Sequence, residues 1–190
     1  MVRAMCLSAR LLSAACLALA SGLATAADAW TELARPGAVV LFRHATAPGV
    51  GDPPNFRLDD CATQRNLDEQ GRAEARRLGE QFRRRGVNVG AVLSSQWCRT
   101  RETARLAFGD RVRDEPAFNS FFGQAAPQRE EQTERARRVI RDWKGPGVLV
   151  VVTHQVNITA LTGHGATSAE GVVVEPGAQG PLRVLANLQP

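Results

Sequence analysis

The chain has 190 residues, of which 44% are hydrophobic and 23% charged, with 10 prolines. This composition is typical of one soluble globular domain and excludes a disordered, collagenous or low-complexity protein. The formal charge of +5 falls to +3 without Arg3 and Arg10, and no basic run is longer than residues 83–85, so the sequence lacks the charge pattern of a nucleic-acid-binding protein.

Residues 1–26 have the organisation of a secretory signal peptide. Arg3 and Arg10 precede the apolar stretch 11–23, and residues 24–26 (Ala-Thr-Ala) are typical of a cleavage site. The alternative is a membrane anchor or a buried helix, but the apolar stretch is shorter than the roughly 20 residues needed to span a bilayer. We therefore expect an exported protein, periplasmic or secreted, with one domain at residues 27–190 and no stable membrane insertion after cleavage.

Export determines how the cysteines are interpreted. Cleavage removes Cys6 and Cys16 and leaves Cys61 and Cys98, an even pair in a compartment where disulfides persist. The pair can form a disulfide. The alternative is two separate thiols, because the sequence alone does not show that the two residues meet. Two cysteines without a CxxC motif do not favour a zinc site.

The first half of the chain predicts a strand, a loop and a helix. Residues 37–42 form a short apolar run, which indicates a strand buried on both faces. Residues 47–60 contain three prolines and two glycines and predict a loop. Asp68 is a suitable N-cap for a helix that runs to Arg85, with small and apolar residues along one face, and Gly86 ends it.

The second half continues the alternation of strands and helices. We predict a strand at 91–94, a helix at about 99–108, an irregular region at 110–127 and a helix at 130–143. The unbroken aliphatic run 148–152 predicts a strand in the centre of a sheet. A short helix at 156–161 and two closing strands at 171–174 and 182–188 follow. These elements predict an α/β fold with a mainly parallel or mixed sheet flanked by helices.

Three of the predicted strands end at, or a few residues before, a side chain that can bind or attack phosphate. Arg43 and His44 follow the first strand, Arg99 lies shortly after the second, and His154 follows the central strand. Ligands of open α/β sheets bind at the carboxyl ends of the strands, so these side chains can converge in one pocket. For any one of them a structural role is more common. Two of only three histidines at equivalent strand ends favour a phosphate site.

These residues resemble a known signature. Residues 41–46 (Leu-Phe-Arg-His-Ala-Thr) are similar to the Arg-His-Gly motif of the histidine phosphatase superfamily, whose fold is shared with phosphoglycerate mutases, with Ala45 in place of the glycine. Similar segments follow in the family order: a helix entry at 65–71, then 92–104, then 151–154. Together they cover most of the chain after residue 26 and are specific, although each alone is a weak signal.

The resemblance implies a phosphatase that works through a phosphohistidine and needs no metal ion or other cofactor. His44 would be the nucleophile, and Arg43 and Arg99 would hold the non-bridging phosphoryl oxygens. His154, if protonated, would add hydrogen bonds to the same group. Arg65 would either bind substrate at the rim of the pocket or lie on the surface. We expect a small phosphorylated substrate, and export favours an envelope sugar phosphate by analogy with the small bacterial branch of the family.

The general acid is where the sequence departs from the family. Larger members place a glutamate between the second arginine and the second histidine, where this chain has Asn119 and Ser120, neither of which donates a proton as a carboxylic acid does. Asn119 is therefore a candidate for substrate binding. Glu115, Asp59 and Asp60 are the candidate acids, and the alternative for each is an ordinary solvated carboxylate.

Two other functions fit the same residues. A phosphomutase would keep the phosphoenzyme and rebind an intermediate, which suits an enclosed pocket and a cytoplasmic metabolite. A phosphate-binding protein would keep the arginines without turnover, and the missing acid favours it. Steady release of phosphate from p-nitrophenyl phosphate, whose leaving group needs little protonation, separates an enzyme from a binding protein.

Overall fold

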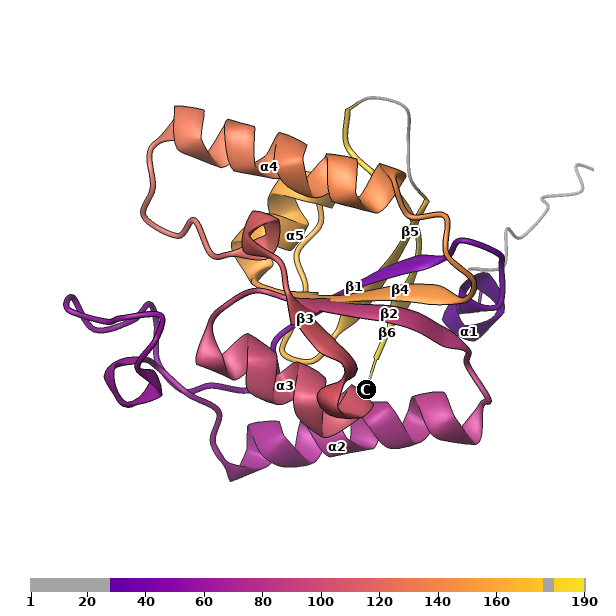
Figure 1. The fold of residues 1–190 in the computed structure, drawn as a ribbon, viewed down its shortest axis with the longest axis horizontal. Coiled ribbons are helices and arrows are strands. Elements are labelled where there is room, and N and C mark those ends of the chain that lie inside the picture. Colours follow the sequence, from indigo (N-terminus) through magenta and orange to yellow (C-terminus); the bar gives the residue numbers. More distant parts are fainter. Residues whose placement is uncertain (1–27, 176–179, 190) are drawn as a thin grey trace, which may run out of the picture.

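The structure, a computed structural model, describes residues 28–175 and 180–189. The predicted signal peptide lies outside these residues. Within them, the strands form one sheet between two layers of helices (Figure 1). No helix in the described part of the chain combines the length and apolarity needed to cross a membrane.

The sheet is mixed, as predicted, with the strand order β3-β2-β4-β1-β5-β6. Its strands are β1 (Val39–Arg43), β2 (Val89–Ser94), β3 (Val112–Asp114), β4 (Val148–Thr153), β5 (Gly171–Glu175) and β6 (Arg183–Leu188). The first four run parallel to one another, β5 pairs antiparallel with β1, and β6 pairs antiparallel with β5. β4 lies between β1 and β2 and is buried along its whole length, which confirms the predicted central strand.

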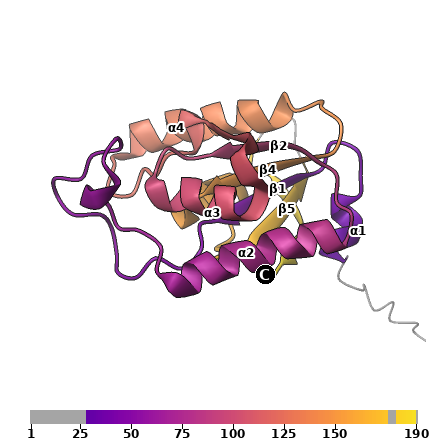
Figure 2. The same cartoon turned by 60° about the horizontal axis from the view of Figure 1, so that its bottom comes forward.

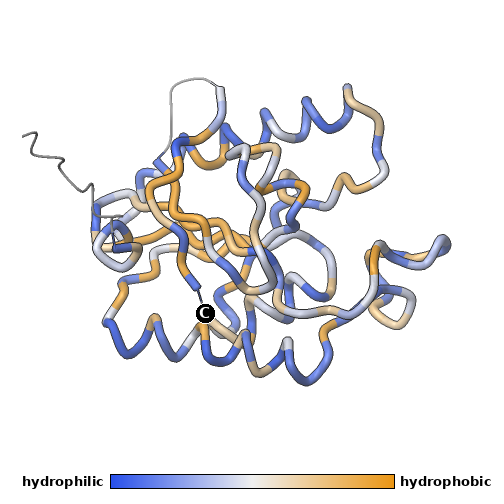
Figure 3. The backbone as a smooth tube through the Cα atoms, turned by 180° about the vertical axis from the view of Figure 1, so that it is seen from behind, coloured by the Kyte–Doolittle hydropathy of each residue, from blue (hydrophilic) through white to orange (hydrophobic). Residues whose placement is uncertain are grey.

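Two helices cover each face of the sheet. α2 (Glu69–Arg84) and α3 (Cys98–Phe108) lie on one side, and α4 (Ala126–Arg141) and α5 (Gln155–Thr162) on the other (Figures 1 and 2). Residues alternate between the faces of a strand, so Val40 and Phe42 of β1 pack towards α2 and α3, whereas Leu41 packs towards α4 and α5. Hydrophobic segments therefore gather inside and hydrophilic ones on the outer helices (Figure 3).

The structure differs from the predicted elements in several places. α4 begins at Ala126 rather than at residue 130, because Pro127 stands in its first turn, where proline is favourable. The region predicted as irregular contains the edge strand β3 and two 3-10 helices, η2 (Gly109–Arg111) and η3 (Pro116–Phe118). A short helix, α1 (Ala29–Leu33), packs against β6 and was not predicted.

The N-terminal end of α2 holds the chain just beyond β1. Asp68 caps the helix by accepting a hydrogen bond from the N–H of Gly71 at 2.8 Å, as predicted. A β-carbon on Gly71 would lie 2.0 Å from the carbonyl oxygen of Thr46, so only glycine allows this approach. The buried Glu74 accepts hydrogen bonds from both the backbone N–H and the hydroxyl of Thr46, at 2.9 and 3.0 Å. These contacts with α2 therefore fix the segment that follows β1.

Candidate active site

The register of two parallel strands brings two histidines together. Arg43 at the end of β1 is paired with Thr153 at the end of β4. The pairing continues one residue further, because the N–H of His44 donates to the carbonyl of Thr153 at 3.0 Å. His44 and His154 therefore leave the sheet side by side, with ring centroids 5.5 Å apart. The predicted convergence of strand ends is present.

The hydrogen bonding of His44 defines which ring nitrogen is free. Its Nδ1 lies 2.7 Å from the carbonyl oxygen of Ala45. A carbonyl only accepts, so Nδ1 carries the proton and Nε2 keeps its lone pair. Burial, with smaller effects from the charges of Arg99, Arg65 and Arg43, lowers the pKa of His44 from 6.5 to about 3, against the opposing effect of the Ala45 hydrogen bond. His44 is thus a neutral imidazole at ordinary pH.

His154 is held between Ser95 and Arg99. Its Nε2 lies 2.8 Å from the Ser95 hydroxyl, and its Nδ1 lies 3.5 Å from Nη2 of Arg99. A guanidinium only donates, so Nδ1 accepts and Nε2 donates to Ser95. Burial lowers the pKa of His154 well below 6.5, and the proximity of His44 and Arg99 adds to the shift. His154 is therefore neutral in this arrangement, so the condition for its predicted role, a protonated ring, is not met here.

Three arginines surround the two histidines. Arg43 donates through Nη1 to Gln155 Oε1 at 2.8 Å and to the Ala166 carbonyl at 3.1 Å. Arg65 donates through Nε to the Gly51 carbonyl at 2.8 Å. The buried Nε–H groups of Arg43 and Arg99 have no partner. All three arginines line one cavity, where their guanidinium groups can bind an anionic group.

Asp52 lies among these groups and was not predicted as a site residue. Its carboxylate accepts two parallel hydrogen bonds from Arg99, at 2.8 Å from Nη1 and 3.1 Å from Nη2. It also accepts from the N–H of Arg65 and the indole N–H of Trp97, both at 3.0 Å. The side chains of Arg99 and Asp52 are only 3% and 9% exposed. The one signal in the sequence is that Asp52 lies in the predicted loop 47–60.

The electrostatics of Asp52 follow from these four donors. Burial by itself would raise its pKa, but the hydrogen bonds from Arg99, from the N–H of Arg65 and from Trp97, with the charge of Arg99, outweigh burial and lower the pKa. Asp52 is therefore ionised and forms a buried ion pair with Arg99. Such a pair is sensitive to the loss of either partner, because the remaining charge stays buried.

One cavity of about 1490 Å³ contains all of these groups. One wall comes from α4, with Arg129, Thr133 and Arg137, and the loops around Val50 and Phe122 also line the cavity. Val50 and Phe122 are the large hydrophobic side chains with high exposure among the described residues, at 89% and 63%. The cavity thus combines a positively charged floor with a polar wall and exposed apolar side chains.

The structure does not bring the predicted acids to this cavity. Asp59 is 87% exposed and lies 3.6 Å from Arg57, and Asp60 caps the 3-10 helix η1 (Cys61–Thr63). Glu115 caps η3 by accepting from the N–H of Ala117. None of the three lines the cavity, because each is used at a turn or on the surface.

Asn119 also lies outside the cavity lining, although it supports a residue inside it. Its Oδ1 accepts from the Ser95 hydroxyl at 3.3 Å and from the N–H of Gln96 at 2.8 Å. Ser95 in turn accepts from His154. Asn119 therefore positions His154 through Ser95, instead of facing a substrate as predicted.

The substitution of alanine for the glycine of the signature is accommodated by packing. Ala45 is fully buried in a small cluster with Leu67, Ala75 and Ala169. Its N–H donates to the hydroxyl of Thr103 at 3.1 Å. The extra methyl group is therefore part of a core between α2 and the strand end and leaves the hydrogen bonding of His44 intact.

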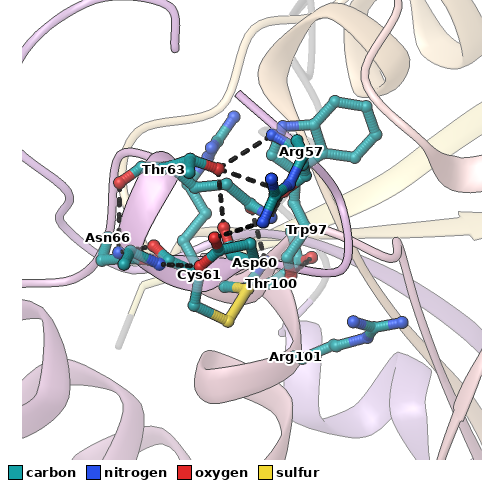
Figure 4. The surroundings of a disulfide bond; sticks show 12 residues. Arg57, Asp60, Cys61, Thr63, Asn66, Trp97, Thr100 and Arg101 are labelled. Carbon is teal, nitrogen blue, oxygen red and sulfur yellow. Dashed lines mark hydrogen bonds and ion pairs between the residues drawn. A yellow bond between two sulfur atoms is a disulfide. The ribbon is translucent and has the colours of Figure 1, made fainter. Parts of the chain in front are cut away.

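Cys61 and Cys98 form a disulfide in the structure, with an S–S distance of 1.98 Å. The bond links η1, in the loop region that carries Asp52, to the first residue of α3 (Figure 4). Arg99 and Trp97 flank Cys98 in the sequence, so the disulfide fixes the segment that supplies three of the four donors to Asp52. Among the residues that the structure describes, no group of three or more His, Cys, Asp or Glu side chains is arranged to hold a metal ion.

Comparison with known proteins identifies the family. The sequence profile of the histidine phosphatase superfamily (branch 1) matches residues 39–144. The chain belongs to this superfamily. The match supports phosphatase activity and covers the segment that carries His44 and Arg99. No curated protein matches the chain at a significant level.

Solved structures of this superfamily share the fold. The putative phosphohistidine phosphatase SixA from Agrobacterium tumefaciens is 23% identical with a TM-score of 0.52, and the match covers 82% of this chain and 99% of that one. YhfR from Bacillus stearothermophilus is 19% identical with a TM-score of 0.55, over 78% and 95% of the two chains. A mycobacterial glucosyl-3-phosphoglycerate phosphatase is 17% identical with a TM-score of 0.51, over 77% and 95%. The phosphoglycerate mutase-like fold is thereby confirmed.

Proposed function

We propose that the protein is an exported phosphatase that hydrolyses phosphate monoesters through a phosphohistidine at His44, without a metal ion. The observation that carries the proposal is that His44 is neutral and has one free ring nitrogen. Its Nδ1 is bound to the Ala45 carbonyl, and Nε2 retains a lone pair in a cavity that also contains Arg43 and Arg99. A neutral imidazole nitrogen beside guanidinium groups is suited to attack a phosphorus atom whose oxygens those groups hold.

The reaction would proceed in two steps. In the first, Nε2 of His44 forms a bond to phosphorus while the bond from phosphorus to the leaving oxygen breaks. In the second, water attacks phosphorus and the N–P bond returns its electron pair to Nε2. Splitting one displacement into two is the advantage of covalent catalysis. The donors for the non-bridging oxygens would be the guanidinium groups of Arg43 and Arg99, which line the cavity with His44.

The charge balance of the cavity supports catalysis without a metal ion. The guanidinium groups of Arg43, Arg65 and Arg99 are close enough to affect the pKa of His44, and the carboxylate of Asp52 is paired with Arg99. The surplus of two positive charges matches the charge of about −1.5 to −2 that a phosphate monoester carries at neutral pH. These arginines would supply the neutralisation that a metal ion supplies elsewhere. Activity is therefore expected to persist in excess EDTA.

Export is supported by the disulfide between Cys61 and Cys98, because such bonds persist in oxidising compartments and are rare in the cytosol. It also agrees with the signal-like composition of residues 1–26. Periplasmic or secreted protein with an N-terminus at residue 27 would support the proposal. Full-length protein in the cytosol would contradict it.

A small phosphorylated substrate is proposed, with an envelope sugar phosphate as the preferred class. Carbohydrate hydroxyls can hydrogen-bond to the polar side chains of Arg129, Thr133 and Arg137 on the α4 wall, and Phe122 offers an aromatic face. The mycobacterial relative acts on glucosyl-3-phosphoglycerate by its name. Comparing kcat/KM over sugar, nucleotide and lipid phosphates tests this choice, and a preference for nucleotides or lipids would overturn it.

Release of phosphate from p-nitrophenyl phosphate tests the activity itself. The wild-type protein is expected to release phosphate steadily, and His44→Ala is expected to be inactive with an unchanged circular dichroism spectrum. Phosphate binding without release would instead indicate a binding protein. Release of phosphate at the wild-type rate by His44→Ala would refute the role of His44.

A further inference from the structure

Asp52 is a carboxylate bound to the arginine that is expected to bind phosphate. Its two oxygens meet Nη1 and Nη2 of Arg99 at 2.8 and 3.1 Å, as two oxygens of a phosphoryl group would. Both side chains line the cavity that contains His44. Asp52 and a phosphoryl group therefore compete for the same donors.

Most N–H groups of Arg99 already have hydrogen-bond partners, so few remain for a phosphate. Besides Asp52, its Nη1 donates to the Arg65 carbonyl at 3.3 Å and its Nη2 faces His154 Nδ1. Only its buried Nε–H is unpartnered. A phosphoryl group that binds Arg99 by two parallel hydrogen bonds must therefore take the place of Asp52. The displaced carboxyl group then lies beside the bound phosphoryl group, on the side of loop 47–60.

We propose that Asp52 is the proton donor to the leaving oxygen, released from Arg99 when the phosphoryl group of the substrate takes its place. The proposal rests on the proposed phosphatase function and supplies the acid that Glu115, Asp59 and Asp60 do not provide. Because Asp52 touches the leaving group in this role, it is a catalytic residue and not a support for Arg99.

The exchange of partners also changes the protonation of Asp52. In the structure Asp52 accepts hydrogen bonds from the guanidinium of Arg99, the backbone N–H of Arg65 and the indole of Trp97, which keep its pKa low despite burial. After displacement it faces an anionic phosphoryl group, and burial then favours the neutral acid. The proton comes from solvent or from the monoanionic form of the substrate. Binding of the substrate thus converts Asp52 from a carboxylate into the protonated acid.

The proton balance closes over the two steps. As Nε2 of His44 bonds to phosphorus, the electron pair of the breaking P–O bond goes to the leaving oxygen, which takes the proton of the Asp52 carboxyl group. The Asp52 carboxylate then accepts a proton from the water that attacks phosphorus, and the N–P electron pair returns to Nε2. After phosphate leaves, Asp52 gives its proton to solvent and rebinds Arg99.

The dependence of kcat/KM on the leaving group tests the proposal, because kcat/KM reports the first phosphoryl transfer. For Asp52→Asn we expect a loss of about a hundredfold or more on alkyl phosphates and less than about tenfold on p-nitrophenyl phosphate, whose leaving group is a stable anion. Asp59→Asn, the same change at an exposed position of the same loop, is expected to behave like the wild type.

Each outcome decides between Asp52 as acid and Asp52 as support. An equal loss on both substrates would mean that Asp52 only positions Arg99, and would overturn the proposal. If Asp52→Asn does not fold, the wild-type protein answers the question with a series of aryl phosphates of increasing leaving-group pKa. A nearly constant kcat/KM is expected, and a steep decline would overturn the proposal. A wild-type protein that hydrolyses none of these esters would instead refute the phosphatase function itself.

Discussion

The buried state of His44 predicts that acid destabilises the fold over a defined range of pH. In the folded protein the pKa of His44 is lowered to about 3, whereas in the unfolded chain it is about 6.5. Between these values the unfolded chain binds a proton that the folded protein does not, so stability falls as the pH decreases. One pH unit is worth about 1.4 kcal/mol, so at pH 5, about 1.5 units below the unfolded value, His44 costs about 2 kcal/mol.

The substitution His44→Asn isolates this contribution. The asparagine amide can still donate to the Ala45 carbonyl, and it does not titrate. Urea unfolding at pH 8 and pH 5 is expected to show that the wild type loses about 2 kcal/mol more than His44→Asn between the two conditions. The lowered pKa of His154 acts in the same direction but is present in both proteins. His164→Asn, on an exposed loop, controls for the loss of a histidine. Equal pH dependence of the wild type and His44→Asn would refute the reasoning.

Two further predictions concern the floor of the cavity and its disulfide. Arg99→Lys keeps the charge but loses the two parallel donors, so kcat/KM for p-nitrophenyl phosphate is expected to fall by about a hundredfold. The control is Arg101→Lys, which changes a partly exposed ion pair with Asp114. Similar activity in both variants would show that Arg99 does not bind phosphate. Replacing Cys61 and Cys98 together by serine removes a link over 37 residues, which is expected to lower the free energy of unfolding by about 4 kcal/mol in urea denaturation. An unchanged midpoint would contradict that stabilisation.

The central features of the fold could be predicted because they depend on local patterns and on one geometric rule. The aliphatic runs of β1 and β4 are long enough to identify buried strands. Parallel strands present their carboxyl ends at one edge, so His44 and His154 were expected to meet. The sequence therefore predicted both the sheet and the pair of histidines at its edge.

Features that depend on tertiary contacts could not be predicted in the same way. β3 has three residues and gains its structure by pairing with β2, so no periodic pattern marks it. Asp52 shares its loop with Asp59 and Asp60, and nothing in their spacing shows which carboxylate reaches Arg99. Asn119 was expected at the substrate because of its place in the family pattern, but its side chain supports Ser95. Each of these roles is set by residues far away in the sequence.

Trapping the covalent intermediate tests the central claim most directly. The protein is mixed with a phosphorylated substrate, quenched within milliseconds in base, where phosphohistidine is stable, and digested for mass spectrometry. The proposed mechanism predicts one phosphoryl group on the peptide that contains His44, lost on acid treatment and absent from His44→Asn. Steady turnover with a phosphoryl group on another residue, or with none on His44 under conditions that trap the intermediate in other phosphohistidine enzymes, would contradict the mechanism.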